Sequence, residues 1–340
     1  MNLEFDPDIS VCIANYNGGE FVLECLESVR RQEGDFTIEI IVHDDASTDD
    51  SANSIERLFP EALLLRSTKN SGFCVSNNRM ASAARGRYVL LLNNDAILHD
   101  GSLQAFFSSA EGGLQDCILG LPQRSLADNL IVDHGYRIDP FLNPIPILTQ
   151  DTHEVGVATG ACLWIPKKIW GDVGGFPEWF ESIAEDIFLC MAARLLGYRV
   201  VVLATPCFDH WIGKNLGGGK LVGSTLQSTV RRRTLSERNK IFVMLCCYPW
   251  PVITALMPLH AVSLLLEATF LLLVGTKPSA VWRIYASIPG AMWRCRGNAC
   301  ALRERLMRQK QVDSNGLFAF TDWLPHKLRM LLRHGIPNLD

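Results

Sequence analysis

Three polar residues, Asn93, Asn94 and Asp95, directly follow the short apolar run Val89–Leu92. A run of this length is too short for an independent helix and predicts a strand buried on both faces, as in a parallel sheet covered by helices. Open α/β sheets bind ligands just outside the carboxyl ends of their strands. A carboxylate flanked by carboxamides at that edge suits a hard divalent cation, Mg2+ or Mn2+, which takes one or two protein oxygens and fills its shell with phosphates and water.

The same residues also fit a purely structural role. Asn-Asn-Asp is a typical turn sequence, and Asp95 could cap a helix expected near Leu103–Ala110. These residues alone do not distinguish a cation site from a turn, so the choice depends on the elements around them.

A β-α-β unit is predicted at the start of the chain. Ile9–Ala14 and Thr37–Val42 are apolar runs typical of strands, and an amphipathic helix separates them. The right-handed crossover of such units brings the ends of both strands to one edge of a single sheet. We therefore expect the polar turn that begins at Asn15 and the acidic turn His43–Ser51 to lie at the same edge.

The acidic turn has two interpretations. Asp44 or Asp45 could accept a hydrogen bond from a nucleotide base or ribose, because a carboxylate at a sheet switch point is well placed to read N–H and hydroxyl groups. Alternatively, Ser47, Thr48 and Asp49 simply cap the helix that follows.

Phosphate binding would need its own source of positive charge, because the chain contains no glycine-rich loop of the GxGxxG or GxxxxGK type. This absence argues against dinucleotide-binding and P-loop proteins. A metal ion at Asp95 would supply the charge. Arg79, on a helix predicted over Val75–Ala84, is either a second phosphate contact or part of a solvated helix face.

Glu185 and Asp186 open a predicted helix. A carboxylate beside the carbon undergoing substitution could act as a general base on an incoming hydroxyl, whereas two acids in a first helical turn also complement the helix dipole. His210 comes just past a strand predicted over Gly197–Leu203, the last strand that we expect. A lone histidine is usually structural, but its ring nitrogen at that position could complete a metal site with Asp95.

These motifs, in this order, resemble those of the inverting family 2 glycosyltransferases, which have a GT-A fold. The resemblance covers about residues 9–250, and it rests on several separate blocks rather than on one motif. The blocks are Ser10–Gly18, Val42–Ser51, Asn70–Asp95, the stretch that runs from Thr159-Gly-Ala-Cys-Leu through Gly174-Gly-Phe and Glu185-Asp-Ile-Phe-Leu-Cys to Gly197-Tyr-Arg-Val, and His210. The Asn-Asn-Asp form of the metal motif, with Asn93 where the commoner form has an acid, looks like that of the rhamnosyltransferase-like branch.

The resemblance implies a role for each matching residue. Asp45 would bind the pyrimidine base, Asp95 would hold the metal that bridges the diphosphate, and His210 would join that metal site. Asp186 would be the catalytic base, with Glu185 beside it. The other residues expected to contact the nucleotide sugar are Asn15, Asp44, Asn70, Gly72, Asn78 and Asn94.

The implied reaction is a single displacement. Asp186 would deprotonate an acceptor hydroxyl, which attacks the anomeric carbon from the face opposite the nucleoside diphosphate, while the cation stabilises the leaving charge. One displacement inverts the anomeric configuration. We expect a dTDP- or UDP-sugar as donor, with dTDP-L-rhamnose first, and a glycan or lipid-linked glycan as acceptor.

The charge distribution argues against nucleic acid as a partner, because the formal net charge is -4. Basic residues are concentrated in the last third of the chain, which predicts contact with an anionic membrane. The 11 cysteines have no CxxC pair and no regular spacing, as expected for reduced thiols in the cytosol. Met1–Asp8 has neither the basic region nor the apolar core of a signal peptide, so we expect the catalytic body to stay in the cytoplasm.

The segment Val252–Val274 is mostly apolar over 23 residues, long enough for a helix that crosses a bilayer. Glu267 would cost about 2.5–3.5 kcal/mol in the hydrocarbon, and both flanks are basic, against the positive-inside rule for a single crossing. We therefore predict an interfacial or re-entrant helical hairpin hinged near Pro258, followed by a basic amphipathic segment over residues 280–310. A buried helix pair packed on the catalytic domain is the alternative.

Together these features predict an α/β protein with a GT-A-type, Rossmann-like mixed sheet flanked by helices. The catalytic domain would span residues 1–240, with a nucleotide-sugar half over about 1–110 and an acceptor half over about 111–240. Residues 241–340 would form a helical region that associates, as a peripheral or monotopic element, with the cytoplasmic face of the inner or plasma membrane.

Two other classes of function stay open. A nucleotidyltransferase would share the acidic sheet edge but release pyrophosphate, and it would usually carry an early basic, glycine-rich loop. A non-catalytic membrane scaffold would keep its cellular role after Asp186→Asn.

Overall fold

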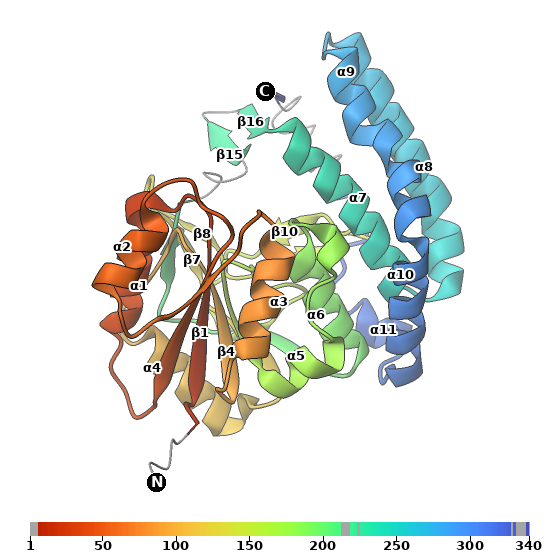
Figure 1. The fold of residues 1–340 in the computed structure, drawn as a ribbon. Coiled ribbons are helices and arrows are strands. Elements are labelled where there is room, and N and C mark those ends of the chain that lie inside the picture. Colours follow the sequence, from red (N-terminus) through yellow and green to blue (C-terminus); the bar gives the residue numbers. More distant parts are fainter. Residues whose placement is uncertain (1–5, 212–217, 223–224, 328, 331–337, 340) are drawn as a thin grey trace. The chain divides into compact units, whose positions relative to one another are not determined.

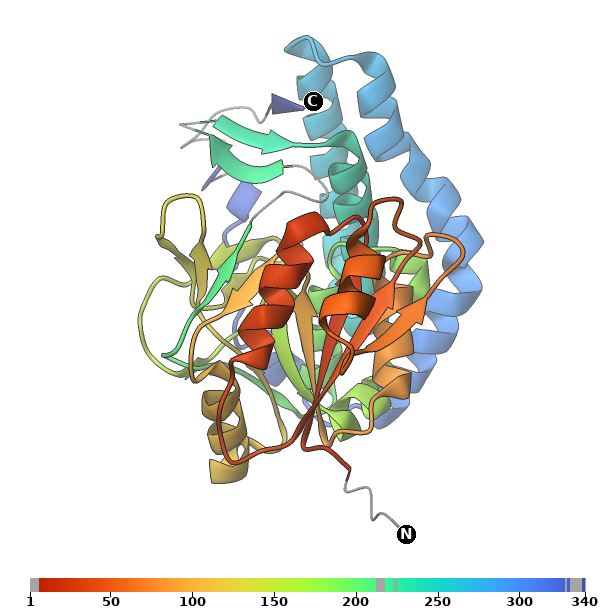
Figure 2. The same ribbon diagram turned by 60° about the vertical axis from the view of Figure 1, so that its left-hand side comes forward.

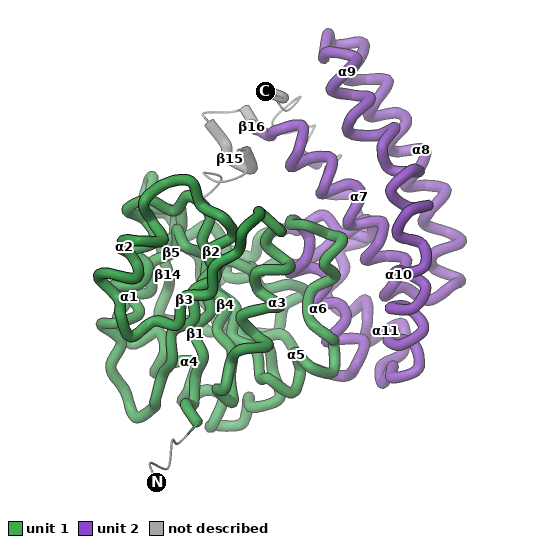
Figure 3. Tube along the Cα trace, viewed as in Figure 1, with its two compact units in different colours: residues 1–136, 146–182, 198–211 green, residues 137–145, 183–197, 212–340 purple. Residues whose placement is uncertain are grey.

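The computed structural model describes residues 6–211, 218–222, 225–327, 329–330 and 338–339. The chain divides into two compact units, each discontinuous in sequence (Figure 3). Unit 1 comprises residues 1–136, 146–182 and 198–211, and unit 2 comprises residues 137–145, 183–197 and 212–340. The domain boundaries expected near residues 110 and 240 stay predictions.

Unit 1 contains an eight-stranded mixed sheet in the order β11-β13-β6-β12-β4-β1-β2-β3 (Figure 1). Its strands are β1 Ile9–Asn15, β2 Ile38–Asp44, β3 Leu63–Arg66, β4 Tyr88–Asn93, β6 Cys117–Gly120, β11 His153–Glu154, β12 Cys162–Pro166 and β13 Arg199–Val202. β1 pairs in parallel with β2 and β4, and β12 runs antiparallel between β4 and β6. The predicted α/β class, the mixed sheet and the first β-α-β unit are confirmed.

Helices cover both faces of this sheet. In Figure 1, α1, α2 and α4 lie on one face and α3 and α5 on the other. Their bounds are α1 Gly19–Arg30, α2 Ser51–Leu58, α3 Phe73–Ala83, α4 Ser102–Ser109 and α5 Lys167–Val173, with short helical segments η1 Ala110–Leu114 and η2 Glu178–Phe180. α1 buries Val22, Cys25, Leu26 and Val29, and Leu23 packs partly buried against the same core.

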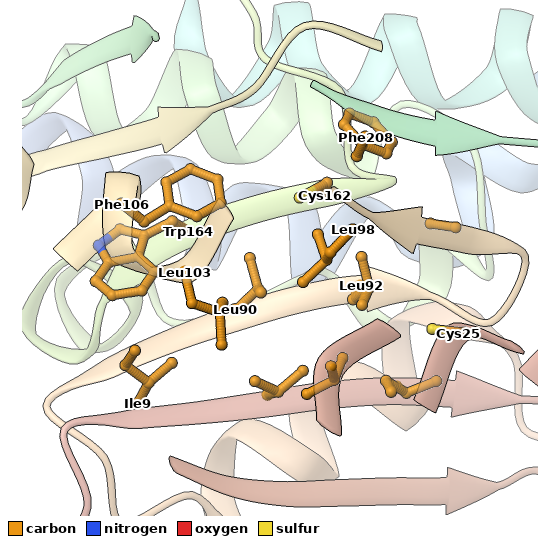
Figure 4. Close-up of a cluster of buried hydrophobic side chains, with 14 of the residues drawn as sticks. Ile9, Cys25, Leu90, Leu92, Leu98, Leu103, Phe106, Cys162, Trp164 and Phe208 are labelled. Carbon is orange, nitrogen blue, oxygen red and sulfur yellow. The ribbon is translucent and has the colours of Figure 1, made fainter. Parts of the chain in front are cut away.

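The core between the sheet and α1 and α4 is built from apolar residues of β1, β4 and β12 (Figure 4). Trp164 of β12 stacks on Tyr88 with ring centroids 4.7 Å apart and on Phe106 of α4 at 5.3 Å. Burying a side chain such as Phe106 contributes roughly 1.5–3 kcal/mol. This packing makes β4 the buried centre of the sheet, as its apolar sequence predicts, and fixes the polar residues at its end.

A second, four-stranded sheet of unit 1 has the order β5-β14-β7-β8. Its strands are β5 Ala96–Leu98, β7 Gln123–Ser125, β8 Ile131–Asp133 and β14 Phe208–His210. Between residues 112 and 151 the chain forms β6, β7, β8, β9 Tyr136–Ile138 and β10 Pro144–Pro146. β14 follows the strand over Gly197–Leu203 that was expected to be the last.

Unit 2 is mainly helical. Its helices are α6 Glu185–Leu195, α7 Val230–Cys247, α8 Trp250–Leu273, α9 Pro278–Val281, η3 Trp282–Ala286, α10 Ser287–Gln309 and α11 Ser314–Leu317, and a small sheet contains β15 Gly218–Val222, β16 Thr225–Ser228 and β17 Asn338–Leu339. α7 packs against α6 and α10. Figures 1 and 2 show the chain reversing after α8, so that α9 and α10 return beside it.

The hinge predicted at Pro258 is wrong, because α8 continues through this proline as one helix. The reversal occurs instead at Gly275, whose φ of +89° is a conformation that glycine adopts at little cost. Only 17% of the most apolar 18-residue stretch of α8 is buried, which disfavours the alternative of a buried helix pair. The helix is long and apolar enough to cross a membrane.

Candidate active site

Polar residues from three parallel strands meet at the carboxyl edge of the unit 1 sheet. β1 ends at Asn15, β2 at Asp44 and β4 at Asn93. Asn15 lies opposite Asp44 in the β1–β2 register, and Ala14 lies opposite Asn93 in the β1–β4 register. The β-α-β crossover therefore brings the polar turns to one edge, as predicted.

Asn15 connects two of these turns through its side chain, which is 1% exposed. Its Nδ2 donates to Asp44 Oδ1 at 2.8 Å and to Ser51 Oγ at 2.9 Å, and its Oδ1 accepts from Asn94 Nδ2 at 3.3 Å. Both amide hydrogens and the carbonyl oxygen are thus engaged within the protein. Asn15 ties the turn after β2 to the turn after β4, and its hydrogen bonds go to protein groups.

Asp44 and Asp45 differ in what they bind. Asp44 accepts from Asn15 and from both the backbone N and the Oγ of Ser47, so it organises its own turn. Asp45 accepts from the backbone N–H groups of Ser71 at 2.8 Å and Gly72 at 2.7 Å. A carboxylate has about four acceptor positions, which leaves Asp45 able to accept another hydrogen bond.

The loop that Asp45 holds contains two of the predicted nucleotide-binding residues. Asn70 is exposed, and Gly72 has a φ of +93° that favours glycine. A Cβ on Gly72 would lie 3.2 Å from the backbone oxygen of Glu181, so a glycine is also required by space. Asp45 and Gly72 therefore form one local unit at the sheet edge.

Asn78 takes part in a different contact. Its Nδ2 donates to the backbone oxygen of Phe176 at 2.9 Å, and its Oδ1 accepts from the backbone N of Phe176 at 2.9 Å. The side chain fastens α3 to the turn after α5. The structure thus gives Asn78 a structural partner, and its predicted contact with the nucleotide sugar stays a prediction.

Asp95 and His210 are brought together by the pairing of β5 with β14. His210 Nε2 lies 3.1 Å from Asp95 Oδ1 and 3.3 Å from Asn93 Nδ2. Asp95 is 6% exposed, and it leads into a strand, since the residue that precedes α4 is Gly101. The alternative of Asp95 as a helix cap is therefore wrong.

The donor set at this point fits a divalent cation. Two ligands of one octahedral ion, each about 2.1 Å from it, lie about 3.0 Å apart when adjacent, close to the 3.1 Å between Asp95 Oδ1 and His210 Nε2. Asn93 Oδ1 is buried and has no hydrogen-bond partner among the described residues. No group of three His, Cys, Asp or Glu side chains in the described part of the chain is placed to hold a metal ion, so phosphate and water oxygens would complete the shell.

Two polar clusters near this edge were not predicted. Asp209 binds Arg124 on β7 and His99, which directly follows β5, and it was not predicted because β14 itself was not expected. His43 Nε2 lies 3.2 Å from Arg79 Nη1. Burial, together with the charge of Arg79, lowers the pKa of His43, so the ring is neutral at pH 7 and Arg79 has a protein partner.

Glu185 and Asp186 begin α6 in unit 2. Glu185 is 8% exposed, and burial, reinforced by the charge of Asp186, raises the pKa of Glu185 to about 8. The carboxyl of Glu185 is therefore mostly protonated at pH 7, and the negative charge of the pair resides on Asp186. The first turn of α6 shows no side-chain cap from Ala184.

The backbone before this pair is in an unusual conformation. Ile183 and Ala184 have φ values of +70° and +66°, which cost of order 1–3 kcal/mol each in residues other than glycine. The side chain of Asn239, on α7, donates to the backbone oxygen of Ile183 at 2.7 Å and is fully buried. Such strain held by the surrounding structure is typical of functional sites, and it favours the catalytic interpretation of the pair over simple capping.

Comparison with known proteins agrees with this arrangement. The family described as Glycosyl transferase family 2 matches residues 10–173. An uncharacterized protein, MT1568, from Mycobacterium tuberculosis is 38% identical over 261 residues, which cover 72% of this chain and 77% of the relative. The O-antigen chain rhamnosyltransferase WbaN from Salmonella anatum is 21% identical over 60% of this chain and 66% of its own length.

Solved structures show the same fold at low sequence identity. GalNAc-T7 with UDP, GalNAc and Mn2+ is 12% identical and superposes with a TM-score of 0.58 over 72% of this chain and 48% of that protein. The mannosyltransferase PcManGT from Pyrobaculum calidifontis, in complex with GDP-Man and Mn2+, is 17% identical and superposes with a TM-score of 0.53 over 90% of this chain and 86% of its own.

Proposed function

The chain belongs to glycosyl transferase family 2, the inverting glycosyltransferases with a GT-A fold, and we propose that it transfers L-rhamnose from dTDP-L-rhamnose to a glycan or lipid-linked glycan acceptor. The observation that carries the proposal is the Asp95–His210 pair, 3.1 Å apart at the sheet edge where open α/β sheets bind ligands. A metal ion that binds there would neutralise the diphosphate and stabilise it as a leaving group.

The residues at the edge divide into two groups under this proposal. Asp45 and the loop to Gly72 would bind the base, because the Asp45 carboxylate retains capacity for a hydrogen bond from the N–H of a pyrimidine. Asp95 and His210 would hold Mg2+ or Mn2+. Asn15, Asp44 and Asn94 would act indirectly by fixing the two turns, since they form hydrogen bonds with protein groups.

Asp186 would be the general base. It would take the proton from the acceptor hydroxyl as the oxygen attacks the anomeric carbon, and the bond between that carbon and the diphosphate would break. Glu185 supports this assignment because its raised pKa, about 8, leaves Asp186 as the ionised member of the pair at neutral pH. One displacement would invert the anomeric centre.

The identity of the sugar rests on two arguments. The Asn93-Asn94-Asp95 motif lacks the first acid of the commoner form, and the relative WbaN carries the name of a rhamnosyltransferase. The exposed apolar helix α8 supports an acceptor that is presented at a membrane. We place the enzyme at the cytoplasmic face of the inner or plasma membrane, where lipid-linked acceptors are exposed to soluble nucleotide sugars.

The test is release of nucleoside diphosphate from a panel of dTDP- and UDP-sugars, with Mg2+ or Mn2+ and a lipid extract as the acceptor source. The variants are Asp95→Ala and Asp186→Asn, and Arg85→Gln is the control because Arg85 pairs with Glu39 at the surface. Release that requires the metal and both aspartates, but not Arg85, supports the transferase and identifies the donor. Release of pyrophosphate from a nucleoside triphosphate would instead indicate a nucleotidyltransferase, and no turnover with any donor would indicate a scaffold.

A further inference from the structure

Asp209 is a buried carboxylate whose two oxygens are both engaged by neighbouring strands. Arg124 Nε donates to Asp209 Oδ1 at 2.5 Å and Arg124 Nη2 to Oδ2 at 2.7 Å, a bidentate pair. His99 Nε2 lies 3.1 Å from the same Oδ1. Asp209 is 7% exposed. A bidentate guanidinium–carboxylate pair fixes orientation as well as charge.

The three residues come from β14 and from the two segments that flank it. Asp209 is the middle residue of β14, and Arg124, on β7, is its register partner. On the other side, Asp209 lies opposite Ile97 of β5, and His99 directly follows that strand, two residues past Ile97. The cluster therefore links β14 to β7 within one row of the sheet and to the end of β5.

The metal-binding pair lies in the next two positions along the same two strands. His210 lies opposite Ala96, and the backbone N of Trp211 donates to the backbone oxygen of Asp95 at 3.1 Å. The separation of Asp95 Oδ1 and His210 Nε2 therefore depends on how β14 is aligned with β5. Because successive side chains of a strand point to opposite faces, Asp209 can fix this alignment without occupying the metal site.

We propose that Arg124, acting through Asp209 and His99, is a positioning residue that sets the alignment of β14 and β5 and thereby the affinity of the Asp95–His210 pair for a divalent cation. The inference rests on the proposed function, since it needs that pair to bind the cation. Without Arg124 the buried Asp209 carboxylate loses both bidentate bonds one residue away from His210, and loss of this anchor between β14 and β7 would loosen the alignment of β14 with β5. Groups that support metal ligands typically change metal affinity 10–100-fold when removed.

The experiment is a Mn2+ titration of the full chain with saturating UDP, in which free Mn2+ is measured by electron paramagnetic resonance. Arg124→Gln is expected to weaken Mn2+ binding about 10-fold, and Asp209→Asn to weaken it similarly. Arg124→Lys keeps the charge but loses the bidentate geometry, so it should fall between Arg124→Gln and the wild type. Arg85→Gln, which removes the surface pair with Glu39 at 3.1 Å, is the matched control and should leave Mn2+ affinity unchanged.

Asp95→Ala separates the two proposals. If Asp95→Ala weakens Mn2+ binding and Arg124→Gln does not, although its circular dichroism spectrum is that of the wild type, the positioning role is overturned and the metal site stands. If Asp95→Ala leaves Mn2+ affinity unchanged, the metal site and the positioning role both fail. Should Arg124→Gln not fold, Arg124→Lys decides: wild-type Mn2+ affinity in that variant overturns the inference.

Discussion

Asp95 and His210 are 115 positions apart in the sequence, and their side chains approach to 3.1 Å. The contact is made by β5 and β14, two strands of three residues each that pair antiparallel. Neither strand would be stable alone. The site therefore depends on the larger sheet, whose strand β4 ends at Asn93, and on the core beneath it. Local sequence around either residue contains only half of the site.

His210→Ala should lower nucleoside diphosphate release about 100-fold. A bound metal ion supplies several kcal/mol of charge stabilisation, and each 1.36 kcal/mol corresponds to a factor of ten in rate. Chelation of the wild type should cause a loss of similar size that Mn2+ restores, whereas the variant should need higher Mn2+ for partial recovery. Full activity of His210→Ala at low Mn2+ would remove this histidine from the site.

Asn15→Ala should reduce the free energy of unfolding by about 2–3 kcal/mol, because it leaves the buried Asp44 carboxylate and the Asn94 amide without a shared partner. Urea denaturation followed by circular dichroism measures the change. Asn53→Ala is the control, since Asn53 is exposed and its hydrogen bonds to Asp50 and Arg66 lie at the surface, and its effect should stay within about 0.5 kcal/mol. Equal losses in the two variants would contradict the central role of Asn15.

The sequence predicted the main sheet because its strands carry strong local signals. β1, β2 and β4 are apolar runs that end in Asn or Asp, and the crossover rule then places their ends at one edge. The same reasoning correctly placed Asp45 and Asp95 at this edge, while their contacts with a ligand stay predictions. It could not show that Asn15 and Asp44 bind each other, because hydrogen-bond partners depend on side-chain geometry.

The second sheet escaped prediction for a physical reason. β5, β7, β8 and β14 have three residues each, too few for hydrophobic periodicity to be visible. Asp209 and Arg124 interrupt any apolar pattern in two of them. In α8, the proline at position 258 suggested a hinge from local chemistry alone, but the helix continues through it.

The stability of the protein should fall as the pH rises from about 4.5 to about 8, in part because of Glu185. Its ordinary pKa is 4.5, and burial with the nearby Asp186 charge raises it to about 8 in the folded state. Between these values the folded chain retains a proton that the unfolded chain has lost, so stability decreases with pH and levels off above the folded pKa. Glu185→Gln should remove this dependence. The free energy of unfolding of the variant, measured relative to that of the wild type, should therefore rise by roughly 2 kcal/mol between pH 5 and pH 8. Thermal unfolding at the two pH values tests this, and identical slopes for wild type and variant would contradict it.

Lys240→Met should destabilise unit 2 by about 2–3 kcal/mol, less than the roughly 3–5 kcal/mol of a buried charge left without any partner. Lys327 Nζ also lies 2.7 Å from Glu237 Oε1, so part of the compensation remains. Lys240 Nζ lies 3.2 Å from Glu237 Oε1, with side-chain exposures of 4% and 3%, and 2.8 Å from Asn143 Oδ1. The exposed pair Arg308–Glu304 on α10 provides the control, because Arg308→Met should cost less than about 1 kcal/mol. Adding Glu237→Gln to Lys240→Met should recover part of the loss in urea denaturation, and no recovery would mean that packing rather than charge is responsible.

In α8, the acidic residue contacts the rest of unit 2, and several leucines are exposed. Glu267 forms ion pairs with Arg233 and Lys327, while Leu265 and Leu266 are 68% and 66% exposed. This arrangement is typical of a helix in contact with lipid, where ionisable side chains turn toward protein.

The double variant Leu265→Asp, Leu266→Asp should therefore bind at least 10-fold more weakly to vesicles that contain anionic lipid. Each aspartate in a lipid-facing position costs about 2.5–3.5 kcal/mol at hydrocarbon depth and less near the interface. Sedimentation with phosphatidylglycerol vesicles measures binding, and Leu130→Asp is the matched control, since Leu130 is 65% exposed but lies in unit 1. Nucleoside diphosphate release with a soluble acceptor should stay unchanged in the α8 variant, because none of the residues assigned to the donor or the base lies on α8. Unchanged vesicle binding in that variant would mean that α8 is not the membrane-facing surface, and the exposed leucines would then need another partner.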